Sequence, residues 1–212
     1  VTRPNPHQWD VAGHDGTVRV SYTLYGDRAD GTYTGIDRTH AHLNMPATFA
    51  WARGTTDRPV TITFRPPADA RWKVATQLEP TADTLTFRAP HFQYFMDSPV
   101  LLADFTLREW QVTTDRRTAV IRLALHHTGG DAEADLFAAL ARRVVEEQVR
   151  VWGELPEFDF GTYTFIACYL PWVYGDGMEH RNSTILTSTA PLTTGLLGNL
   201  NTLSHEFFHA WN

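Results

Sequence analysis

Short stretches of alternating apolar and polar residues fill the chain up to about residue 120. Three of them, residues 18–25, 60–64 and 84–87, place an apolar side chain at roughly every second position. This period is typical of a β-strand that buries one face. Turns rich in glycine and proline separate the stretches, for example at residues 26–31 and 54–59. The pattern predicts a β-sandwich-like N-terminal domain of short antiparallel strands.

The spacing of apolar residues changes after Thr-Gly-Gly-Asp at residues 128–131. Apolar residues then recur at helical intervals with charged residues between them: Phe137, Leu140, Val144 and Val151. This spacing predicts an amphipathic helix. We therefore expect a domain boundary near Gly130, with a β-rich domain at 1–130 and a second domain at 131–212.

The second domain is predicted to mix strands with helices. Apolar runs at residues 163–170 and 183–188 are expected to be strands, and a glycine-rich turn at 174–177 lies between them. A helix precedes these strands and another follows them. The whole chain is therefore predicted to have an α+β fold.

The last predicted helix carries the motif with the most specific chemistry. From residue 194 onward, apolar residues three or four positions apart form one helical face: Leu196, Leu200, Leu203 and Phe207. His205 and His209 lie four positions apart on a neighbouring face, so both imidazoles can reach one metal ion. Glu206 is placed to accept a proton from an attacking water. The motif predicts a zinc metallopeptidase; the alternative is a helix whose histidines bind no metal.

Composition narrows the classes of partner. The chain has 212 residues, with 18 basic and 24 acidic side chains and 42% hydrophobic residues. Because the basic residues form no run, we expect peptides or small molecules and no nucleic acid as partners. No transmembrane segment and no leader are recognisable, which favours a cytoplasmic location and leaves open a leader removed before Val1. The single cysteine, Cys168, lies in an apolar run and is expected to be buried and unreactive.

Four other histidines are not predicted to bind metal. His40 and His42 alternate on a predicted strand, and we expect them on a solvated strand face because no acidic partner is apparent. The same interpretation applies to His126 and His127. Three tryptophans of the β-rich half are expected to pack in its core or in a surface cleft: Trp51, Trp72 and Trp110.

Residues 205–212, His-Glu-Phe-Phe-His-Ala-Trp-Asn, resemble the zinc motif of the M61 family of metallopeptidases, the glycyl aminopeptidase family. The Trp-Asn extension separates this motif from a bare His-Glu-x-x-His pattern. Residues 177–183, Gly-Met-Glu-His-Arg-Asn-Ser, are similar to the segment that precedes the zinc helix in that family. Residues 44–49 and 97–100 look like signatures of its N-terminal domain. The resemblance therefore extends over nearly the whole chain.

The resemblance implies a β-rich N-terminal domain followed by the first part of a thermolysin-like (gluzincin) catalytic domain. It also implies a zinc ion on His205 and His209, and an aminopeptidase activity that removes N-terminal residues such as Gly or Ala from peptides. In the similar motif of related aminopeptidases, the glutamate at the position of Glu179 receives the free α-ammonium group of the substrate. The alternative for Glu179 is a turn residue that caps the glycine-rich loop.

The family pattern takes its third zinc ligand, a glutamate, from a position downstream of the two histidines. This ligand is expected beyond Asn212, so we expect the 212-residue chain to bind zinc weakly and to be inactive by itself. We also expect the apolar face of the last helix to lack cover.

Two other functions stay open. One is a metalloendopeptidase that uses the same zinc site and binds an extended peptide along residues 183–188. The other is a non-catalytic β-sandwich binding module with a vestigial zinc motif. The oligomeric state is not indicated by the sequence.

Overall fold

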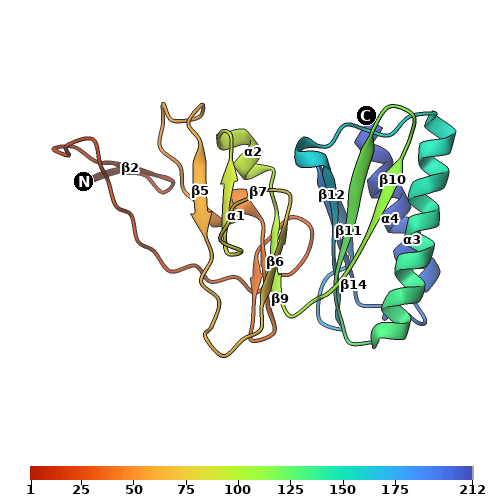
Figure 1. Ribbon diagram of the computed structural model, residues 1–212. Coiled ribbons are helices and arrows are strands. Elements are labelled where there is room, and N and C mark those ends of the chain that lie inside the picture. Colours follow the sequence, from red (N-terminus) through yellow and green to blue (C-terminus); the bar gives the residue numbers. More distant parts are fainter. Residues whose placement is uncertain (212) are drawn as a thin grey trace.

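The computed structural model describes residues 1–211, whose strands form two groups that face each other (Figure 1). The N-terminal group contains a hairpin, a four-stranded sheet in the order β3-β4-β9-β6 and a three-stranded sheet in the order β5-β8-β7. The strands are β1 (Thr2–Asn5), β2 (Gln8–Asp10), β3 (Gly35–Ile36), β4 (His40–Leu43), β5 (Val60–Thr63), β6 (Lys73–Thr76), β7 (Glu79–Pro80), β8 (Thr86–Ala89) and β9 (Val100–Ala103). The helices of this group are α1 (Met45–Thr48) and α2 (Phe92–Met96).

The two N-terminal sheets share one hydrophobic core. Leu43 of β4 and Val100 of β9 come from the four-stranded sheet, while Val60 of β5 and Phe87 of β8 come from the three-stranded sheet. Successive side chains of a strand point to opposite faces, so the alternating sequence of β5 buries one face against the other sheet. The β-rich N-terminal domain predicted from the sequence is confirmed as two packed sheets.

One predicted strand does not form. Residues 18–25 run without regular strand pairing, and most of their apolar side chains stay exposed, among them Val20 at 66% and Tyr22 at 53%. The hydroxyl of Tyr22 donates to the carbonyl oxygen of Thr48 at 2.7 Å and ties this segment to α1. The prediction was wrong because alternation produces a strand only where a neighbouring strand supplies backbone partners and burial.

The tryptophans of this half differ in burial. Trp72 packs against the N-terminal core, and Trp110 packs against the core of the second half, as the sequence indicated. Trp51 is 54% exposed and lies with its ring centroid 5.0 Å from that of Phe92. It therefore packs on the surface, which agrees with the predicted alternatives.

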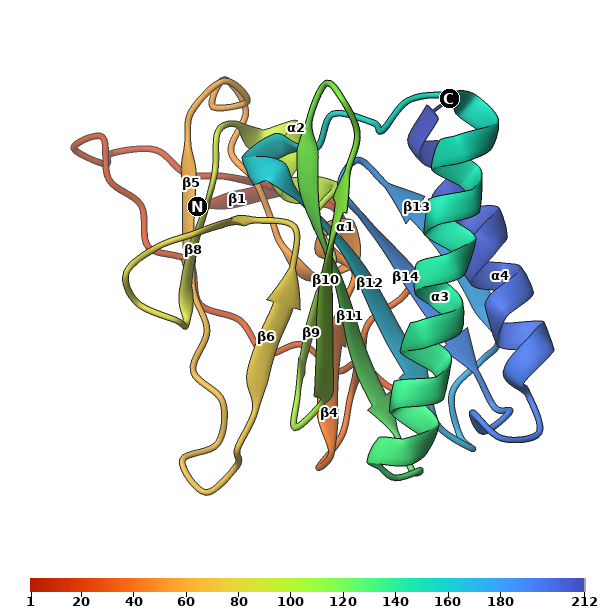
Figure 2. The same cartoon turned by 45° about the vertical axis from the view of Figure 1, so that its right-hand side comes forward.

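The C-terminal group is one five-stranded sheet in the order β10-β11-β12-β14-β13, with two helices on one face (Figures 1 and 2). β11, β12 and β14 are parallel, whereas β10 and β13 pair antiparallel at the edges. The elements are β10 (Thr106–Thr113), β11 (Thr118–His127), α3 (Asp131–Trp152), β12 (Thr162–Tyr169), β13 (Asp176–His180), β14 (Ser183–Ser188) and α4 (Leu196–Phe208), with 3-10 turns η1 (Asp159–Gly161) and η2 (His209–Trp211). The two predicted helices and the strands at 163–170 and 183–188 are confirmed, but the predicted turn at 174–177 gives its last two residues to β13.

The strands change from one group to the other between β9 and β10. β10 and β11 precede Gly130 in the sequence, yet they pair with each other and β11 pairs with β12. The C-terminal sheet therefore starts at Thr106, and Gly130 marks only the N-terminal cap of α3. The division into domains at 1–130 and 131–212 stays a prediction. The strand pairing does not change at that boundary.

Opposite faces of the C-terminal sheet contact different partners. On β12, Phe165 faces the helices and shares a core with Phe137 of α3, whereas Ile166 faces the other way. Ile166 belongs to a buried cluster that also contains Ala75 of β6 and Leu101 of β9. The four-stranded sheet of the N-terminal group thus covers the face that the helices leave open, and apolar burial joins the two groups.

α4 lies on the C-terminal sheet with the apolar face that the sequence indicated. Leu200, Leu203 and Phe207 are buried in the core that contains Tyr163, and Leu196 packs against this core. The expectation that this face lacks cover was wrong, because the sheet and α3 already bury it. Burial of this face fixes the rotation of α4 about its axis, and this rotation directs the remaining side chains of the helix.

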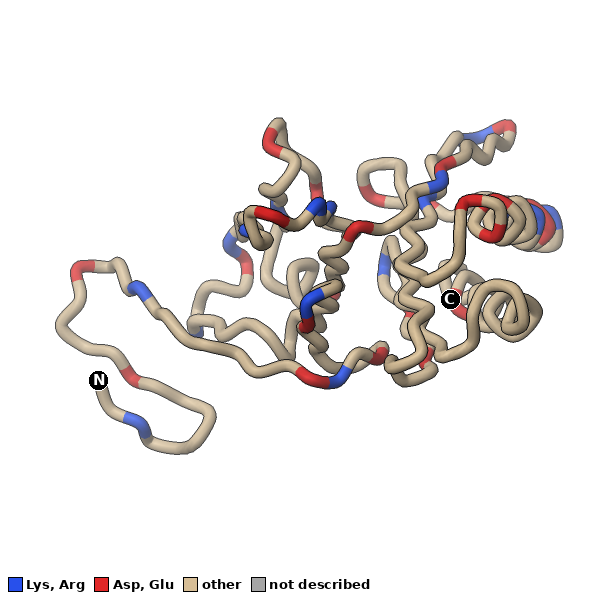
Figure 3. The backbone as a smooth tube through the Cα atoms, turned by 90° about the horizontal axis from the view of Figure 1, so that it is seen from below, with Lys and Arg blue, Asp and Glu red and all other residues tan. Residues whose placement is uncertain are grey.

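Three further expectations concern the surface and the single thiol. Basic and acidic positions are interspersed along the backbone, without a long run of either sign (Figure 3). Within residues 1–211, no helix has both the length and the apolar character needed to cross a bilayer. Cys168 is buried in β12 as expected, and burial raises the pKa of its thiol to about 12, which keeps the thiol protonated at neutral pH.

Candidate active site and metal centre

The C-terminal end of α4 presents the three motif residues. Their exposure differs: His205 is exposed, His209 is half-buried, and Glu206 is only 6% exposed. The ring centroids of His205 and His209 lie 5.2 Å apart. This is the proximity expected of side chains one helical turn apart.

β13 brings a second carboxylate to this helix end. Glu179, Glu206 and His209 each offer a ligand atom, and these atoms all lie within 4.8 Å of one another. Among residues 1–211 this is the one group of at least three such side chains with that spacing. Glu179 was singled out from the sequence by its motif alone, and the structure places it beside α4.

The donor types of this group are compatible with zinc. Imidazole nitrogens and carboxylate oxygens are both zinc ligands, and a catalytic zinc site takes three of them from the protein. His205 is not a member of the compact group, although its ring neighbours that of His209. Asn212, the last residue of the motif, lies outside the described residues.

Gly177 of β13 allows the close approach of Glu206. A Cβ atom at position 177 would lie 2.7 Å from the Cδ atom and 2.9 Å from the Cγ atom of Glu206. At such distances either the end of the Glu206 side chain or β13 would have to shift, so glycine at position 177 lets the strand pack on the carboxylate where it lies. The sequence showed this glycine as the first residue of the segment 177–183. It could not show why a glycine is needed there, because the reason is a contact with α4.

We expect Gly177→Ala to destabilise the fold by about 1–3 kcal/mol, because the added methyl group forces Glu206 or β13 to move. Chemical denaturation of the 212-residue chain measures this loss. Gly198→Ala is the matched control: Gly198 lies within α4, and a Cβ atom there has no neighbour within 4 Å. Equal stability of the Gly177 variant and the wild type would show that Glu206 does not pack on β13 in solution.

The surroundings of Glu206 favour its protonated form. Burial raises the pKa of Glu206, and the nearby carboxylate of Glu179 raises it further. His205 and His209 act in the opposite direction. A carboxylate with a raised pKa is a stronger proton acceptor near neutral pH than an ordinary glutamate.

Two histidines outside this site are buried and a third is partly buried, which corrects the prediction that they lie on a solvated face. His40 and His42 of β4 are each 1% exposed, and His126 of β11 is partly buried with its ring centroid 5.2 Å from that of His40. Asp37 lies 3.1 Å from Nδ1 of His40, so an acidic partner is present. The sequence did not show their burial because the two sheets that enclose them come together only in the tertiary structure.

These histidines do not form a compact metal-binding group. Within residues 1–211, no set of three or more possible metal ligands with the spacing found at α4 includes His40, His42 or His126. Burial lowers the pKa of His42 and of His126 to about 4 and lowers the pKa of His40 as well. These three histidines are therefore neutral. They lie where the N-terminal group of strands meets the C-terminal group. His127 is likewise half-buried with a lowered pKa.

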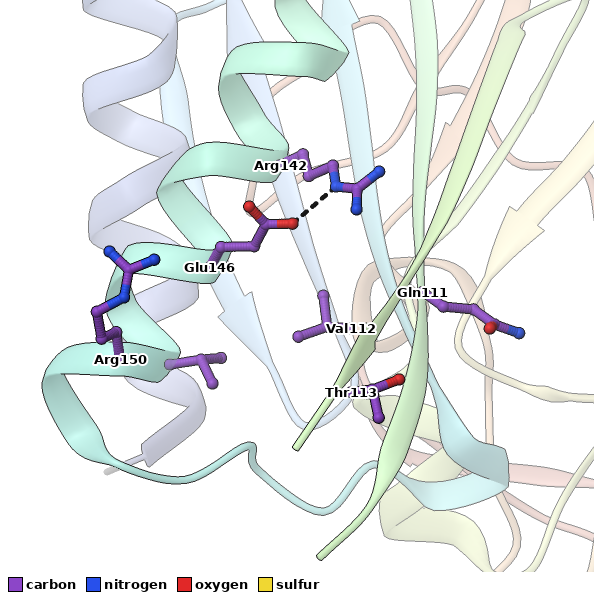
Figure 4. A pocket seen from close by; sticks show the side chains of 7 residues that line it. Gln111, Val112, Thr113, Arg142, Glu146 and Arg150 are labelled. Carbon is purple, nitrogen blue, oxygen red and sulfur yellow. Dashed lines mark hydrogen bonds and ion pairs between the residues drawn. The ribbon is translucent and has the colours of Figure 1, made fainter. Parts of the chain in front are cut away.

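A surface pocket of about 500 Å³ lies elsewhere, between β10 and α3 (Figure 4). Gln111 and Thr113 line it from β10, and Arg142 and Glu146 pair across one turn of α3 with 2.7 Å between Nε and Oε1. None of its lining residues belongs to the group at the end of α4. We place the candidate chemistry at α4, because perturbed ionisation and metal-ligand spacing are found there.

Comparison with known proteins identifies the first half of the chain. Residues 1–104 match the family model of the Peptidase M61 N-terminal domain. They are a peptidase M61 N-terminal domain. The match ends at the position where the strands change from β9 to β10. A search of curated proteins finds no match.

Solved structures show the same fold over most of the chain. An aminopeptidase N family protein from Idiomarina loihiensis matches 87% of this chain and 33% of its own with a TM-score of 0.65 and 24% identity. Legionella pneumophila aminopeptidase A, solved in complex with aspartic acid, matches 89% of this chain and 24% of its own with a TM-score of 0.57 and 15% identity. At these identities the likeness establishes the fold, and the chain spans a third or less of these two proteins. The predicted α+β fold is thereby confirmed.

Proposed function

We propose that the protein carrying this chain is a zinc-dependent aminopeptidase that removes small N-terminal residues, Gly or Ala, from peptides. The observation that carries the proposal is the group of Glu179, Glu206 and His209, which lies next to an M61 N-terminal domain. The preference for Gly or Ala rests on the resemblance of the motifs to the glycyl aminopeptidase family.

His205 and His209 would hold the zinc ion. When bound, zinc lowers the pKa of a water molecule to about 7 and polarises the carbonyl group of a substrate. The third protein ligand is proposed to be a glutamate beyond Asn212. Within the group of Glu179, Glu206 and His209, Glu179 is the carboxylate that does not come from α4.

Glu206 would act as general acid and base. It takes a proton from the attacking water and passes this proton to the leaving amine. Its raised pKa, caused first by burial, suits both steps because the carboxyl group has to accept and then release the proton near neutral pH. The packing of Glu206 against Gly177 holds the carboxylate between α4 and β13.

Glu179 would recognise the free amino end of the substrate. It is exposed and lies on the edge strand β13, within 4.8 Å of the ligand atoms of Glu206 and His209. A carboxylate at this position forms a charge-assisted contact with an α-ammonium group. That contact sets the scissile bond one residue away from the amino end, which is the selectivity of an aminopeptidase.

We expect Glu179→Ala to lower kcat/KM for peptides with a free amino end by roughly tenfold to a hundredfold, because a charge-assisted hydrogen bond contributes about 1.5–3 kcal/mol. N-acetylated peptides lack the ammonium group and should be affected much less. Steady-state kinetics on both substrates with the full natural protein measure this split. Glu154→Ala, at an exposed loop glutamate, is the control.

The strand on which the endopeptidase alternative would bind its peptide has no free edge. β14, residues 183–188, pairs with β12 on one side and β13 on the other, so it has no free edge for a peptide. The two edge strands of the sheet are β10 and β13, and β13 is the one that lies next to β14. Equal effects of Glu179→Ala on free and blocked peptides would nevertheless favour an endopeptidase and overturn the aminopeptidase proposal.

We expect the 212-residue chain to bind zinc more weakly than structural zinc sites, whose binding free energies are about 10–16 kcal/mol. His209→Ala should abolish the binding, because His209 belongs both to the helix pair and to the compact group. Isothermal titration with zinc chloride measures the affinity, and His14→Ala, at an exposed histidine, is the control. Unchanged affinity of the His209 variant would place the zinc elsewhere.

A further inference from the structure

β13 is held at both ends by the M61 N-terminal domain. At its C-terminal end, Asp97 of the domain accepts hydrogen bonds from Nδ1 of His180 and from the backbone N–H of Arg181, each at 3.0 Å. Asp97 caps the C-terminal end of α2, so its backbone is fixed by that helix. The anchored residues directly follow Glu179 in the sequence.

Gln77 of the same domain adds a buried bridge to this anchor. Its Nε2 atom donates to the carbonyl oxygen of Asp97 at 2.8 Å and to Oδ2 of Asp97 at 3.2 Å. Its Oε1 atom accepts from the backbone N–H of Asn182 at 2.8 Å and from Oγ of Ser183 at 2.9 Å. Gln77 is 5% exposed, so these bonds are made away from water, where an unmade bond is costly.

The other end of β13 meets a loop of the domain. The backbone N–H of Gly31 donates to Oδ2 of Asp176 at 3.1 Å. A Cβ atom at position 31 would lie 2.7 Å from this oxygen and 3.1 Å from Cβ of Met178. Met178 in turn packs against the apolar cluster that both groups of strands share. The loop therefore fits closely against the first half of β13.

We propose that the M61 N-terminal domain positions Glu179 by clamping the two ends of β13, through Asp97 and Gln77 at one end and Gly31 at the other. The role of Glu179 in amine recognition rests on the function proposed above. An edge strand has backbone partners on one side only, so β13 needs other contacts to stay in place. A recognition group has to be held to within about 0.5 Å of its productive position. The clamp supplies these contacts, and Asp97, Gln77 and Gly31 are positioning residues.

The first test is made on the 212-residue chain and does not depend on activity. Hydrogen exchange of the β13 amides is compared between the wild type and Asp97→Ala, and we expect about tenfold faster exchange in the variant. Asp97→Asn should retain most of the protection, because its oxygen still accepts from Arg181 and its amide can donate to the other tautomer of His180. Asp83→Ala is the matched control, since Asp83 accepts from Leu85 and Thr86 within the domain, away from β13.

Gly31→Ala tests the clamp at its other end, independently of Asp97. The added methyl group should also accelerate exchange in β13, while β12 and β14 keep their protection. Unchanged exchange of β13 in both Asp97→Ala and Gly31→Ala would overturn the proposal. Equal acceleration by Asp83→Ala would also overturn it, because the effect would then be a general loss of stability.

The second test uses peptide hydrolysis by the full natural protein. Asp97→Ala should raise KM for free-amine peptides by about tenfold more than for N-acetylated peptides, and Asp97→Asn should restore it. Faster exchange in β13 combined with equal kinetic effects on both substrates would overturn the link to Glu179. If the wild type does not distinguish the two substrates, the aminopeptidase proposal fails, and hydrogen exchange still decides whether the clamp exists.

Discussion

Glu206→Gln is expected to lower the turnover of the full natural protein by at least about a hundredfold, because general acid and base catalysis contributes roughly 10²–10⁴-fold. The glutamine has nearly the shape of the glutamate, so the packing against Gly177 and the position of α4 stay as they are. It lacks the capacity to take a proton at neutral pH. His205 and His209 are untouched, and zinc affinity is expected to stay within a few-fold of the wild type.

Two measurements separate this loss of turnover from a loss of structure or metal. Zinc content after dialysis and the denaturation midpoint are compared for Glu206→Gln, the wild type and Glu154→Gln, whose glutamate lies in an exposed loop. A low turnover with normal zinc content and stability assigns the chemistry to Glu206. An unimpaired rate in the glutamine variant would remove Glu206 from the mechanism.

The local part of the site could be predicted from the sequence. The periodic apolar residues of α4 fixed which face is buried, and the i,i+4 spacing placed His205 and His209 beside each other. Glu179 was found only through its resemblance to a family motif. Its proximity to α4 could not be predicted, because it depends on the strand order that puts β13 next to β14 at the sheet edge.

The parts that the sequence did not predict all depend on contacts between distant segments. Residues 18–25 alternate like a strand but have no partner, and β10 looks like the strands before it although it pairs with the second half. Asp97 lies 83 positions before His180, and Gln77 lies 105 positions before Asn182. Periodicity reports which face of an element is buried, and it contains no information about which other element covers that face.

The fold is expected to lose about 3 kcal/mol of stability through His42 alone as the pH falls from 6.5 to 4. Burial lowers the pKa of His42 from 6.5 to about 4, and the neighbouring His40 and His180 lower it too, against Asp30, which raises it. Between these two pH values the unfolded chain binds a proton at this histidine and the folded chain does not. Unfolding is therefore favoured increasingly as the pH decreases, and the stability is fully present above pH 6.5.

Other groups steepen the same transition. His126, with a pKa of about 4, and His40, with a lowered pKa, act in the same window as His42. Below pH 4, protonation of aspartates lowers the stability further. The pKa of Asp37 is lowered to about 2 and that of Asp97 is also lowered, so the stability that these carboxylates contribute is lost when they are protonated. Acid should therefore destabilise the contact between the M61 N-terminal domain and the C-terminal sheet in two stages.

Urea denaturation of the 212-residue chain at a series of pH values from 7 to 4 measures this dependence. In His42→Leu the proton uptake at this site is removed, so the free energy of unfolding should fall with pH less steeply by about 1.4 kcal/mol per pH unit within the window. His14→Leu, at an exposed histidine, should keep the wild-type slope. The same slope in His42→Leu and the wild type would mean that His42 is accessible to protons in the folded chain, and that the two groups of strands do not seal it from water.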